Sequence, residues 1–591
     1  MASPPASLWR YIWTYRVQAI VGMLCVSGYL GGSLASPIVL RHAIDALREG
    51  GDGRAFAVQL ALFLALAVLV LLVAVVMRRN LLGLANRVEH DIRRDVFGHL
   101  TTLDAAYFQR ERTGDLMTKM TSDLGAVREM IGQGLLQGSR TLIGFPLAFG
   151  IMFSTNFKLS LVVAFLLPVI SVMFFFLIRL IRKYYDLSQE QFSTITNFAQ
   201  ETFAGIRTIK GFGIESRRRG QFTGLNQEFI RRNMTLTRIE EPVWPFMMFL
   251  YWAGAVLLLL LAGRQIIDGR ISLGVYVQFQ QYLIFLQWPM LALGWTINLF
   301  QRGRTSWARI HTILDAQPAV RDEPEGRAQP VPSLRGDIEF DNVALHLAER
   351  RVLDGISLNI PAGQCIGLTG PTGSGKTLLA SLLPRLLDPT SGEVRVGGVP
   401  VRRMALADLR RHVGVAPQEP FLFSDTLANN LAFGLDPVDD AMKAHEAGIL
   451  RAAEIARLSD EVQRFPQQYR TMLGERGVTL SGGQRQRTAI GRALARDPDL
   501  LILDDVFSAV DTQTEARILQ QLLPMLHGRT TILISHRVST LRHASRIVVL
   551  DQGRVVQDGT HAELTAQPGY YRDLDEIQRL EAKLEEVSGD R

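Results

Sequence analysis

Long uncharged apolar runs dominate the first half of the chain, whereas shorter apolar runs broken by Gly, Asp and Arg fill the second half. The clearest run covers residues 55–77, which contain no charged residue over 23 positions. A helix of that length crosses about 30 Å of hydrocarbon. Similar but less pure runs lie at 17–40, 136–155, 158–178, 244–263 and 274–299. The pattern therefore predicts an all-α membrane domain of six spanning helices, followed by a soluble domain with α/β patterning.

The connections between these runs differ in positive charge. Residues 78–128 contain nine Lys and Arg, and residues 179–238 contain eleven. The short connections at 156–158 and 264–270 contain one and two. Because cytoplasmic loops of membrane proteins are enriched in Lys and Arg, both long connections and both termini are expected in the cytoplasm. The prediction is a multi-pass protein of the cytoplasmic (inner) membrane.

The two long connections read as helical extensions of the spans. The stretches "ANRVEHDIRRDVFGHL" and "QFSTITNFAQETFAGIRTIKGF" place apolar residues at three- and four-residue spacing with charges between them. They could be solvated helices without a role. Their length favours contact with another part of the protein.

The amino-terminal stretch "SLWRYIWTYR" mixes aromatic residues with arginine, as helices at a membrane interface do. An alternative is a signal peptide with "SLA" at 33–35 as its cleavage site, which would leave five spans. The apolar run continues past that point, and four aromatic residues are unusual for the start of a signal peptide.

Composition adds limits to this picture. The formal charge of +7 and the pI near 9.5 are explained by membrane-flanking loops, so no nucleic-acid partner is expected. Cys25 and Cys365 are the two cysteines, too few for a disulfide framework. The proline-rich, polar stretch 322–337 is the predicted linker between a membrane domain at 1–321 and a soluble domain at 338–591.

Several polar residues lie in the last predicted span, where polar side chains usually face the interior of a helix bundle. They could line a polar cavity for a substrate, or they could hold neighbouring helices together. The residues are Gln278, Gln280, Gln281, Tyr282 and Gln287.

The second half of the chain contains a glycine-rich loop between a predicted apolar strand and a predicted helix. The stretch "CIGLTGPTGSGKTLLASLL" fits G-x-x-x-x-G-K-[ST], in which backbone N–H groups wrap phosphates. Lys376 is expected to reach the β and γ oxygens of ATP, and Thr377 to hold Mg²⁺. The predicted phosphate-binding residues are Gly370, Pro371, Thr372, Gly373, Ser374, Gly375, Lys376 and Thr377.

The hexamer "LLILDD" supplies the second part of such a site. It reads as a buried strand that delivers Asp504 to the Mg²⁺ at its carboxyl end. Alone it would be an ordinary core strand followed by an incidental acid. Paired with the phosphate loop, it predicts an ATP·Mg²⁺ site.

The stretch "LSGGQRQR" at 480–487 resembles the signature of ABC ATPases. The resemblance extends to Gln418 as the glutamine of the glutamine loop, to Ser508–Asp511 as the D-loop, and to His536 as the switch histidine. Together with the six predicted spans, the resemblance covers nearly the whole chain. The chain therefore resembles a half-transporter of the ABC exporters. The resemblance implies Asp505, His536 and Gln418 as catalytic residues and Thr377, Gln418 and Asp504 as Mg²⁺ ligands. It further implies that Ser481, Gly482, Gly483, Gln484 and Asp511 contact nucleotide.

The family resemblance implies a head-to-tail dimer in which each ATP lies between one phosphate loop and the partner's signature. Two positions depart from the family pattern. Leu347 stands where an aromatic residue usually stacks on adenine, which predicts weaker stacking. Asp505 stands where the catalytic Glu is usual, and its side chain is about 1.5 Å shorter.

A displacement of about 1 Å can cost on the order of 10²-fold in rate, so this chain's own ATP site is expected to be slow unless the backbone shifts to compensate. Its intact signature could still complete a fast site in a partner that carries Glu. The chain thus resembles the degenerate-site subunit of heterodimeric bacterial multidrug exporters of the TmrAB type.

The function predicted from the sequence is ATP-driven export of amphipathic drugs, peptides or lipids across the bilayer. The alternatives are a nucleotide-gated channel or regulator and a homodimeric lipid flippase. The spans exclude a soluble ATPase of DNA repair or translation, and an importer is disfavoured by analogy because the membrane and ATPase halves are fused.

Overall fold

The computed structural model describes residues 7–48, 53–322, 329, 331, 333–347, 350–436, 441–474 and 477–589. Its contacts divide the chain into two compact units. The first comprises Met1–Thr101 and Thr113–Ala316, and the second comprises Thr102–Arg112 and Gln317–Arg591. The predicted linker 322–337 falls partly outside the described residues, and the predicted domain boundaries stay a prediction.

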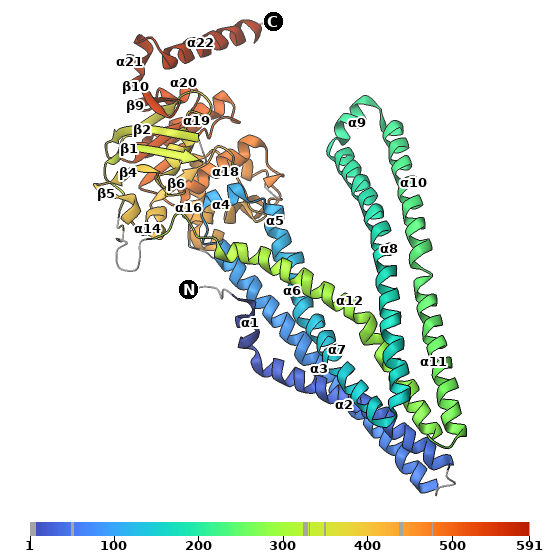
Figure 1. The fold of residues 1–591 in the computed structure, drawn as a ribbon. Coiled ribbons are helices and arrows are strands. Elements are labelled where there is room, and N and C mark those ends of the chain that lie inside the picture. Colours follow the sequence, from blue (N-terminus) through green and yellow to red (C-terminus); the bar gives the residue numbers. More distant parts are fainter. Residues whose placement is uncertain are drawn as a thin grey trace. The chain divides into compact units, whose positions relative to one another are not determined.

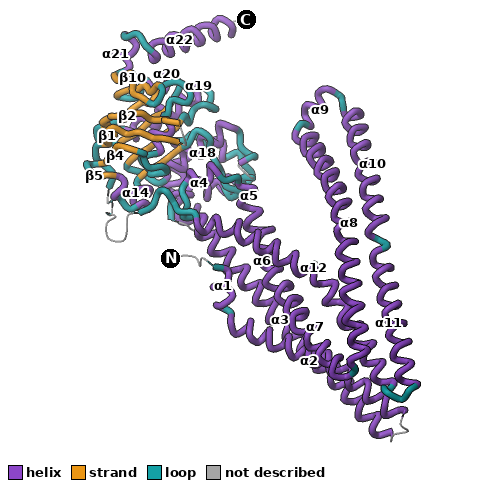
Figure 2. Tube along the Cα trace, viewed as in Figure 1, coloured by secondary structure: helices purple, strands orange, loops and turns teal. Residues whose placement is uncertain are grey.

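All regular secondary structure in the described residues of the first unit is helical (Figures 1 and 2). Its long helices pack lengthwise against one another, and α2 and α3 are the most extensively paired. The helices are α1 (Leu8–Thr14), α2 (Arg16–Arg48), α3 (Gly53–Leu100), α5 (Thr113–Thr118), α6 (Leu124–Glu129), α7 (Leu135–Thr155), α8 (Phe157–Ala204), α9 (Ile206–Phe212), α10 (Glu215–Glu240), α11 (Val243–Ile267) and α12 (Leu273–Asp315). Two π-helical turns, Lys119–Asp123 and Met130–Gly134, flank α6.

Five segments of the described chain are long and apolar enough to cross a membrane: Arg16–Arg48, Phe56–Leu100, Phe157–Ala204, Glu215–Ile267 and Leu273–Asp315. The sixth predicted span forms the 21-residue helix α7 but is not among them. Gln137, Ser139 and Arg140 interrupt its apolar character. The predicted all-α membrane domain is confirmed, with five candidate spans instead of six.

The aromatic residues near the amino terminus divide between two environments. Trp9 and Trp13 of α1 are exposed, with ring centroids 5.8 Å apart. Tyr11 is buried and donates its hydroxyl to Asp95 of α3 over 3.1 Å. Thus only one face of α1 matches an interfacial helix, and the other face anchors α1 to the bundle.

The second long connection forms a hairpin in which α8 and α10 run side by side, with the short helix α9 at its tip (Figure 1). Gly213 ends α9 with φ of 64°, a left-handed conformation that suits glycine. Phe203 and Phe212 beside this tip are 72% and 78% exposed. Two aromatic side chains at this end of the hairpin are therefore largely accessible.

The first long connection contains α4 (Ala105–Arg110), which groups with the second unit. Asp104 caps α4 by accepting from the backbone N–H of Tyr107, and its other oxygen accepts from the N–H of Ala319. Ala106 packs against a hydrophobic core cluster of the second unit. This connection therefore has the contact that its length predicts.

Two sheets organise the second unit (Figure 2). An antiparallel sheet has the order β2 (Arg350–Ile360), β1 (Ile338–Leu347), β4 (Ser391–Val396), β5 (Val399–Pro400). A six-stranded sheet has the order β10 (Arg554–Gly559), β9 (Arg546–Asp551), β3 (Cys365–Thr369), β8 (Thr530–Ile534), β7 (Leu500–Asp504), β6 (Val413–Ala416). In it, β9, β3, β8, β7 and β6 are parallel, so the loops that follow these strands gather at one edge.

Helices cover these sheets and bury two main core clusters. All five residues of β7 are buried, as the continuous apolar run predicts for a central parallel strand. The helices are α13 (Lys376–Ser381), α14 (Leu406–Arg411), α15 (Leu427–Leu431), α16 (Ala441–Ile455), α17 (Ser459–Val462), α18 (Gly482–Ala495), α19 (Thr512–Leu526), α20 (Val538–Leu541), α21 (His561–Ala566) and α22 (Tyr570–Gly589). The predicted fold class, a helical membrane domain followed by an α/β ATPase domain, is confirmed.

Candidate functional site: a nucleotide cavity at the strand ends

A cavity of about 220 Å³ lies at the carboxyl edge of the parallel strands. The loops after β3, β6, β7 and β8 supply most of its wall, which is where open parallel sheets bind ligands. Its lining residues are Val352, Thr372, Gly373, Gly375, Lys376, Thr377, Leu378, Gln418, Asp504, Asp505, Ile534 and His536. The structure thus brings together the phosphate loop, Gln418, the paired aspartates and His536.

The glycine loop has a backbone that other residues would strain. Gly370 has φ of 139°, and a Cβ there would lie 1.9 Å from the carbonyl oxygen of Leu550. Gly375 has φ of 100°, and its Cβ would lie 2.7 Å from a methyl group of Leu353. Glycine is therefore required at both positions by conformation and by space. The cavity lining therefore includes loop positions without a side chain, Gly373 and Gly375, where a ligand can approach the backbone.

The ammonium of Lys376 is held inside this loop. Its Nζ donates to the carbonyl oxygens of Gly370 and Pro371, both at 2.8 Å, and to Ser374 Oγ at 3.4 Å. Burial lowers the pKa of Lys376, and the carboxylates of Asp504 and Asp505 oppose that shift. These three acceptors are neutral oxygens, and a largely buried cation held by neutral oxygens fits an anionic phosphate as its ligand.

Asp504 ends β7 and is buried at the cavity wall. Burial raises the pKa of its carboxyl, and a hydrogen bond from the Thr377 side chain works in the opposite direction. The pair brings a carboxylate and a hydroxyl oxygen together, and these are ligand types that Mg²⁺ prefers. The residues present therefore fit the metal that the sequence predicts.

Asp505 follows with φ of 45°, in the left-handed region that aspartate tolerates better than most residues. Its backbone N–H donates to the carbonyl oxygen of Ile534 over 2.9 Å, which ties the turn to β8. Its carboxylate accepts from the side-chain amide of Gln418, with Nε2 and Oδ2 3.4 Å apart. The acid and the glutamine thus meet across the cavity.

His536 follows the end of β8 on the same wall. Burial lowers the pKa of its imidazole, the charge of Lys376 lowers it further, and Asp505 raises it. The ring is therefore neutral over a wider pH range than an exposed histidine. A neutral imidazole can donate one hydrogen bond and accept another.

The signature residues do not line this cavity. Ser481 caps α18 in a capping box with Gln484: its hydroxyl accepts from the N–H of Gln484, and its own N–H donates to the Gln484 side chain. Gly483 packs closely on the D-loop, since a Cβ there would lie 3.1 Å from the carbonyl oxygen of Ala509. The signature helix and the D-loop are thus one packed assembly.

Asp511 also lies outside the cavity lining. It caps α19 by accepting from the N–H of Thr514 over 2.9 Å, and that hydrogen bond lowers the pKa of its carboxyl. The structure therefore gives Asp511 a local structural role. Its predicted contact with nucleotide stays a prediction.

Val352 lines the cavity and Leu347 does not, so the predicted place of Leu347 beside the base stays a prediction. The two residues lie on paired strands, with Leu347 opposite Arg350. No motif marks Val352, because its position depends on where β2 passes the glycine loop.

Several polar residues of the last predicted span form hydrogen bonds to neighbouring helices. Tyr282 is fully buried and donates its hydroxyl to the carbonyl oxygen of Leu34 over 2.8 Å. Gln278 accepts from Arg41 and donates to Tyr282, both at 3.4 Å, and Gln280 donates to Tyr251 over the same distance. These contacts favour the alternative in which these residues hold helices together.

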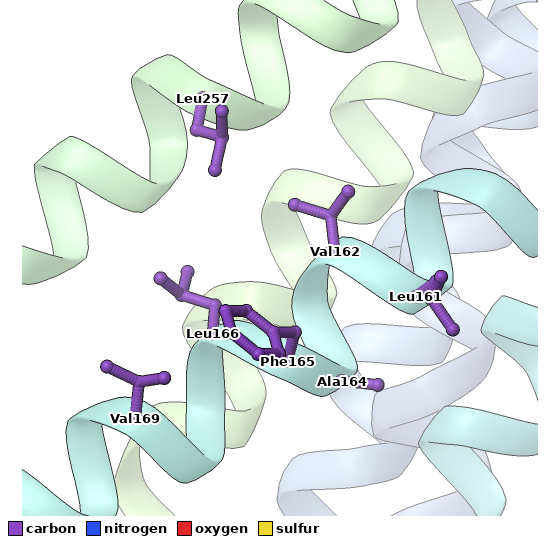
Figure 3. A pocket seen from close by; sticks show the side chains of 7 residues that line it. All are labelled: Leu161, Val162, Ala164, Phe165, Leu166, Val169 and Leu257. Carbon is purple, nitrogen blue, oxygen red and sulfur yellow. The ribbon is translucent and has the colours of Figure 1, made fainter.

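An apolar pocket of about 650 Å³ lies between α8 and α11. Figure 3 shows Leu257 of α11 facing Val162, Leu166 and Val169 of α8 across it. Apolar side chains line it throughout, so it suits hydrocarbon.

Family models match both parts of the chain. The model described as "ABC transporter transmembrane region" matches residues 20–290, and the model described as "ABC transporter" matches residues 353–508. The second match contains the glycine loop, the paired aspartates and the signature. It therefore supports ATP binding and hydrolysis coupled to transport.

Whole-length relatives agree with these matches. The chain is 35% identical to "Multidrug resistance-like ATP-binding protein MdlA" of Escherichia coli, over 98% of this chain and 96% of that protein. It is 32% identical to the "ATP-dependent lipid A-core flippase" of Cupriavidus metallidurans, over 97% and 95%. A solved structure described as "a bacterial Atm1-family ABC exporter with ATP bound" has a TM-score of 0.77 and 26% identity, and the match covers 96% of this chain and 99% of that one. The chain therefore belongs to the ABC transporters, as an exporter-type half-transporter that joins a membrane domain to an ATPase domain.

Proposed function

We propose that this chain is one half of a dimeric exporter whose own ATP site is slow and whose signature completes a fast site in a different partner subunit. The observation that carries this proposal is Asp505, placed in the cavity wall beside Gln418 and His536 where the family usually has Glu. Leu347 departs from the family pattern only at the base, so the short acid is the departure that bears on cleavage.

Each residue of the cavity has a proposed task in this account. The glycine loop and Lys376 bind the phosphates, Asp505 accepts the proton of the attacking water, and His536 and Gln418 orient the reacting groups. Thr377, Asp504 and Gln418 would hold Mg²⁺, which neutralises charge on the phosphates when it is bound. Because the Asp505 carboxylate is about one methylene short, proton acceptance is inefficient and cleavage is slow.

The position of the signature supports a partner. Ser481 and Gly482 stand at the N-terminus of a 14-residue helix, where partial positive charge favours an anion. The cavity of this chain already has Lys376 for its phosphates and contains no signature residue. We propose that Ser481, Gly482, Gly483 and Gln484 contact the nucleotide bound by the partner's phosphate loop.

The two cytoplasmic connections are the proposed route from hydrolysis to the membrane helices. The first holds α4 against the ATPase core through Ala106 and continues directly into α3 and α5. The second presents exposed Phe203 and Phe212 beside α9, which we propose the partner subunit covers. In this arrangement the ATPase domain, both connections and both termini lie on the cytoplasmic side.

The proposed substrate is an amphipathic molecule, a drug, a peptide or a lipid, moved outward. The apolar pocket between α8 and α11 supports a substrate with a hydrocarbon part. The names of the relatives include both multidrug resistance proteins and lipid A-core flippases. A homodimeric lipid flippase is therefore the second candidate function.

The test is ATP-dependent uptake of labelled amphipathic substrate into inverted vesicles, together with identification of the subunit that co-purifies with the chain. Accumulation against a gradient that needs ATP supports an exporter. Equilibration without accumulation would indicate a nucleotide-gated channel. Purification of a pure homodimer would overturn the heterodimer and favour the flippase.

A further inference from the structure

The carboxy-terminal helix α22 reaches the loop that carries His536. The side chain of Gln578 donates from Nε2 to the carbonyl oxygen of His536 over 2.7 Å. Its Oε1 accepts from the backbone N–H of Val538 over 2.8 Å. One side-chain amide therefore binds two successive peptide groups, those on either side of Arg537.

The two hydrogen bonds of Gln578 influence the orientation of the His536 imidazole. The bond to the carbonyl oxygen of His536 orients the peptide group that follows the Cα of His536 and so restricts ψ of that residue. The rotamers open to a side chain depend on φ and ψ of its own residue.

Within the loop, the N–H of Arg537 donates to Ser535 Oγ over 3.0 Å. The carbonyl oxygen of Arg537 accepts from the N–H groups of Thr540 and Leu541. Gln578 adds the support that comes from outside the loop. We propose that Gln578 is a positioning residue that sets the switch histidine for ATP cleavage.

The rest of α22 is docked firmly enough to serve as a fixed support. Tyr571 is fully buried in a cluster with Val538 and Leu541, and its hydroxyl lies 2.8 Å from Nδ1 of His561. The backbone N–H of Tyr571 donates to Gln557 on β10 over 3.1 Å. The position of Gln578 is therefore set by packing on the ATPase domain and not by Gln578 itself.

The other side of the same loop is held by the D-loop and α19. Arg537 donates to the carbonyl oxygen of Val510 over 3.2 Å and pairs with Glu515, which is 1% exposed. Gln486 of the signature helix in turn bonds Ser508 and Ala509 at 2.7 and 2.9 Å. The loop that carries His536 is thus held on one side by the D-loop, which packs on the signature helix, and on the other side by α22.

The role of Gln578 rests on the proposed role of His536, so the test compares both residues. Gln578→Met keeps the length of the side chain and removes both hydrogen bonds, and Glu576→Ala alters an exposed residue of the same helix as the matched control. The assay is single-turnover cleavage of ATP by the full-length assembled dimer, with the other nucleotide site inactivated. Nucleotide affinity and melting temperature are measured on the same samples.

We expect Gln578→Met to slow cleavage by about ten- to a hundred-fold, with unchanged nucleotide affinity and no effect of Glu576→Ala. The melting temperature should fall modestly, because two backbone groups lose their partner. His536→Ala should slow cleavage further, and adding Gln578→Met to it should cause no additional loss, since Gln578 acts only through the histidine. Cleavage unaffected by Gln578→Met while His536→Ala abolishes it would overturn the positioning role alone. Additive losses in the double variant would assign Gln578 a merely structural role. Normal cleavage in His536→Ala would instead remove the proposed role of His536 and the inference with it.

Discussion

Gln418 donates its side-chain amide to the carboxylate of Asp505, with 3.4 Å between Nε2 and Oδ2. This distance is at the long end for a hydrogen bond, so the contact is weak. The backbone of Asp505 is fixed by its own N–H bond to Ile534, so the carboxylate gains little reach from backbone movement. This relationship locates the proposed defect of the site in the side chain and not in the fold around it.

Lys376→Ala is expected to weaken ATP binding at this chain's own site. A hydrogen bond from a charged donor contributes about 1.5–3 kcal/mol, which corresponds to roughly ten- to a hundred-fold in affinity. Direct binding of labelled nucleotide checks this result. Ser381→Ala is the matched control, because the hydroxyl of Ser381 donates to the carbonyl oxygen of Thr377 within the same helix and Ser381 does not line the cavity. Equal affinities for both variants would contradict the assignment of the phosphate loop.

Gly482→Asp is expected to impair turnover by the assembled dimer more than Asp505→Ala does. A Cβ at Gly482 meets Ala509 at 3.5 Å, an ordinary contact, and an acid in the first turn stabilises a helix. The fold should therefore survive while the new charge repels the phosphate of the partner's ATP. Gly482→Ala serves as the uncharged control, and steady-state ATPase activity is the readout. Comparable losses from Gly482→Asp and Asp505→Ala would indicate two equivalent sites.

The pH dependence of kcat/KM at this site should reflect a histidine with a lowered pKa. Because burial and Lys376 lower the pKa of His536 from 6.5, its imidazole stays neutral as the pH falls through that value. If neutral imidazole is the active form, the acid limb of the profile lies below 6.5 and disappears in His536→Ala. The measurement is kcat/KM as a function of pH in dimers whose other nucleotide site has been inactivated. An acid limb above 6.5 that depends on His536 would contradict the structural environment.

Much of the site follows from sequence because short motifs fix both residue type and local backbone. The glycine loop, Asp504 and His536 are each attached to a parallel strand, and parallel strands deliver their carboxyl ends to one edge of the sheet. Apolar runs likewise predict the membrane helices, since only helices satisfy the backbone in hydrocarbon. The predicted span at 136–155 does form a helix, α7, but Arg140 interrupts its apolar run and it is not among the candidate membrane spans.

Contacts between segments that are distant in the sequence cannot be predicted from local sequence patterns. Val352 borders the cavity because β2 passes the glycine loop, and Gln578 reaches the loop of His536 from 42 positions away. Neither residue belongs to a local pattern. The grouping of Thr102–Arg112 with the second unit depends on the packing of Ala106, which no periodicity reveals.

The central claim is that the missing methylene at Asp505 makes this site slow, and Asp505→Glu tests it most directly. The substitution extends the carboxylate without changing its charge. A competent general base contributes about 10²–10⁴-fold, so even part of that gain should be visible. The left-handed backbone at this position, with φ of 45°, disfavours Glu slightly relative to Asp, which makes melting temperature a necessary control.

The measurement is single-turnover ATP cleavage in a dimer whose partner has lost its catalytic acid, with and without Asp505→Glu, at equal nucleotide occupancy. The partner's signature must be intact, since a degenerate signature would keep the site slow for a separate reason. The account predicts cleavage at least about ten-fold faster in the Glu variant, part of the gain that a competent base supplies. Unchanged cleavage in a stably folded variant with an intact partner signature would contradict it.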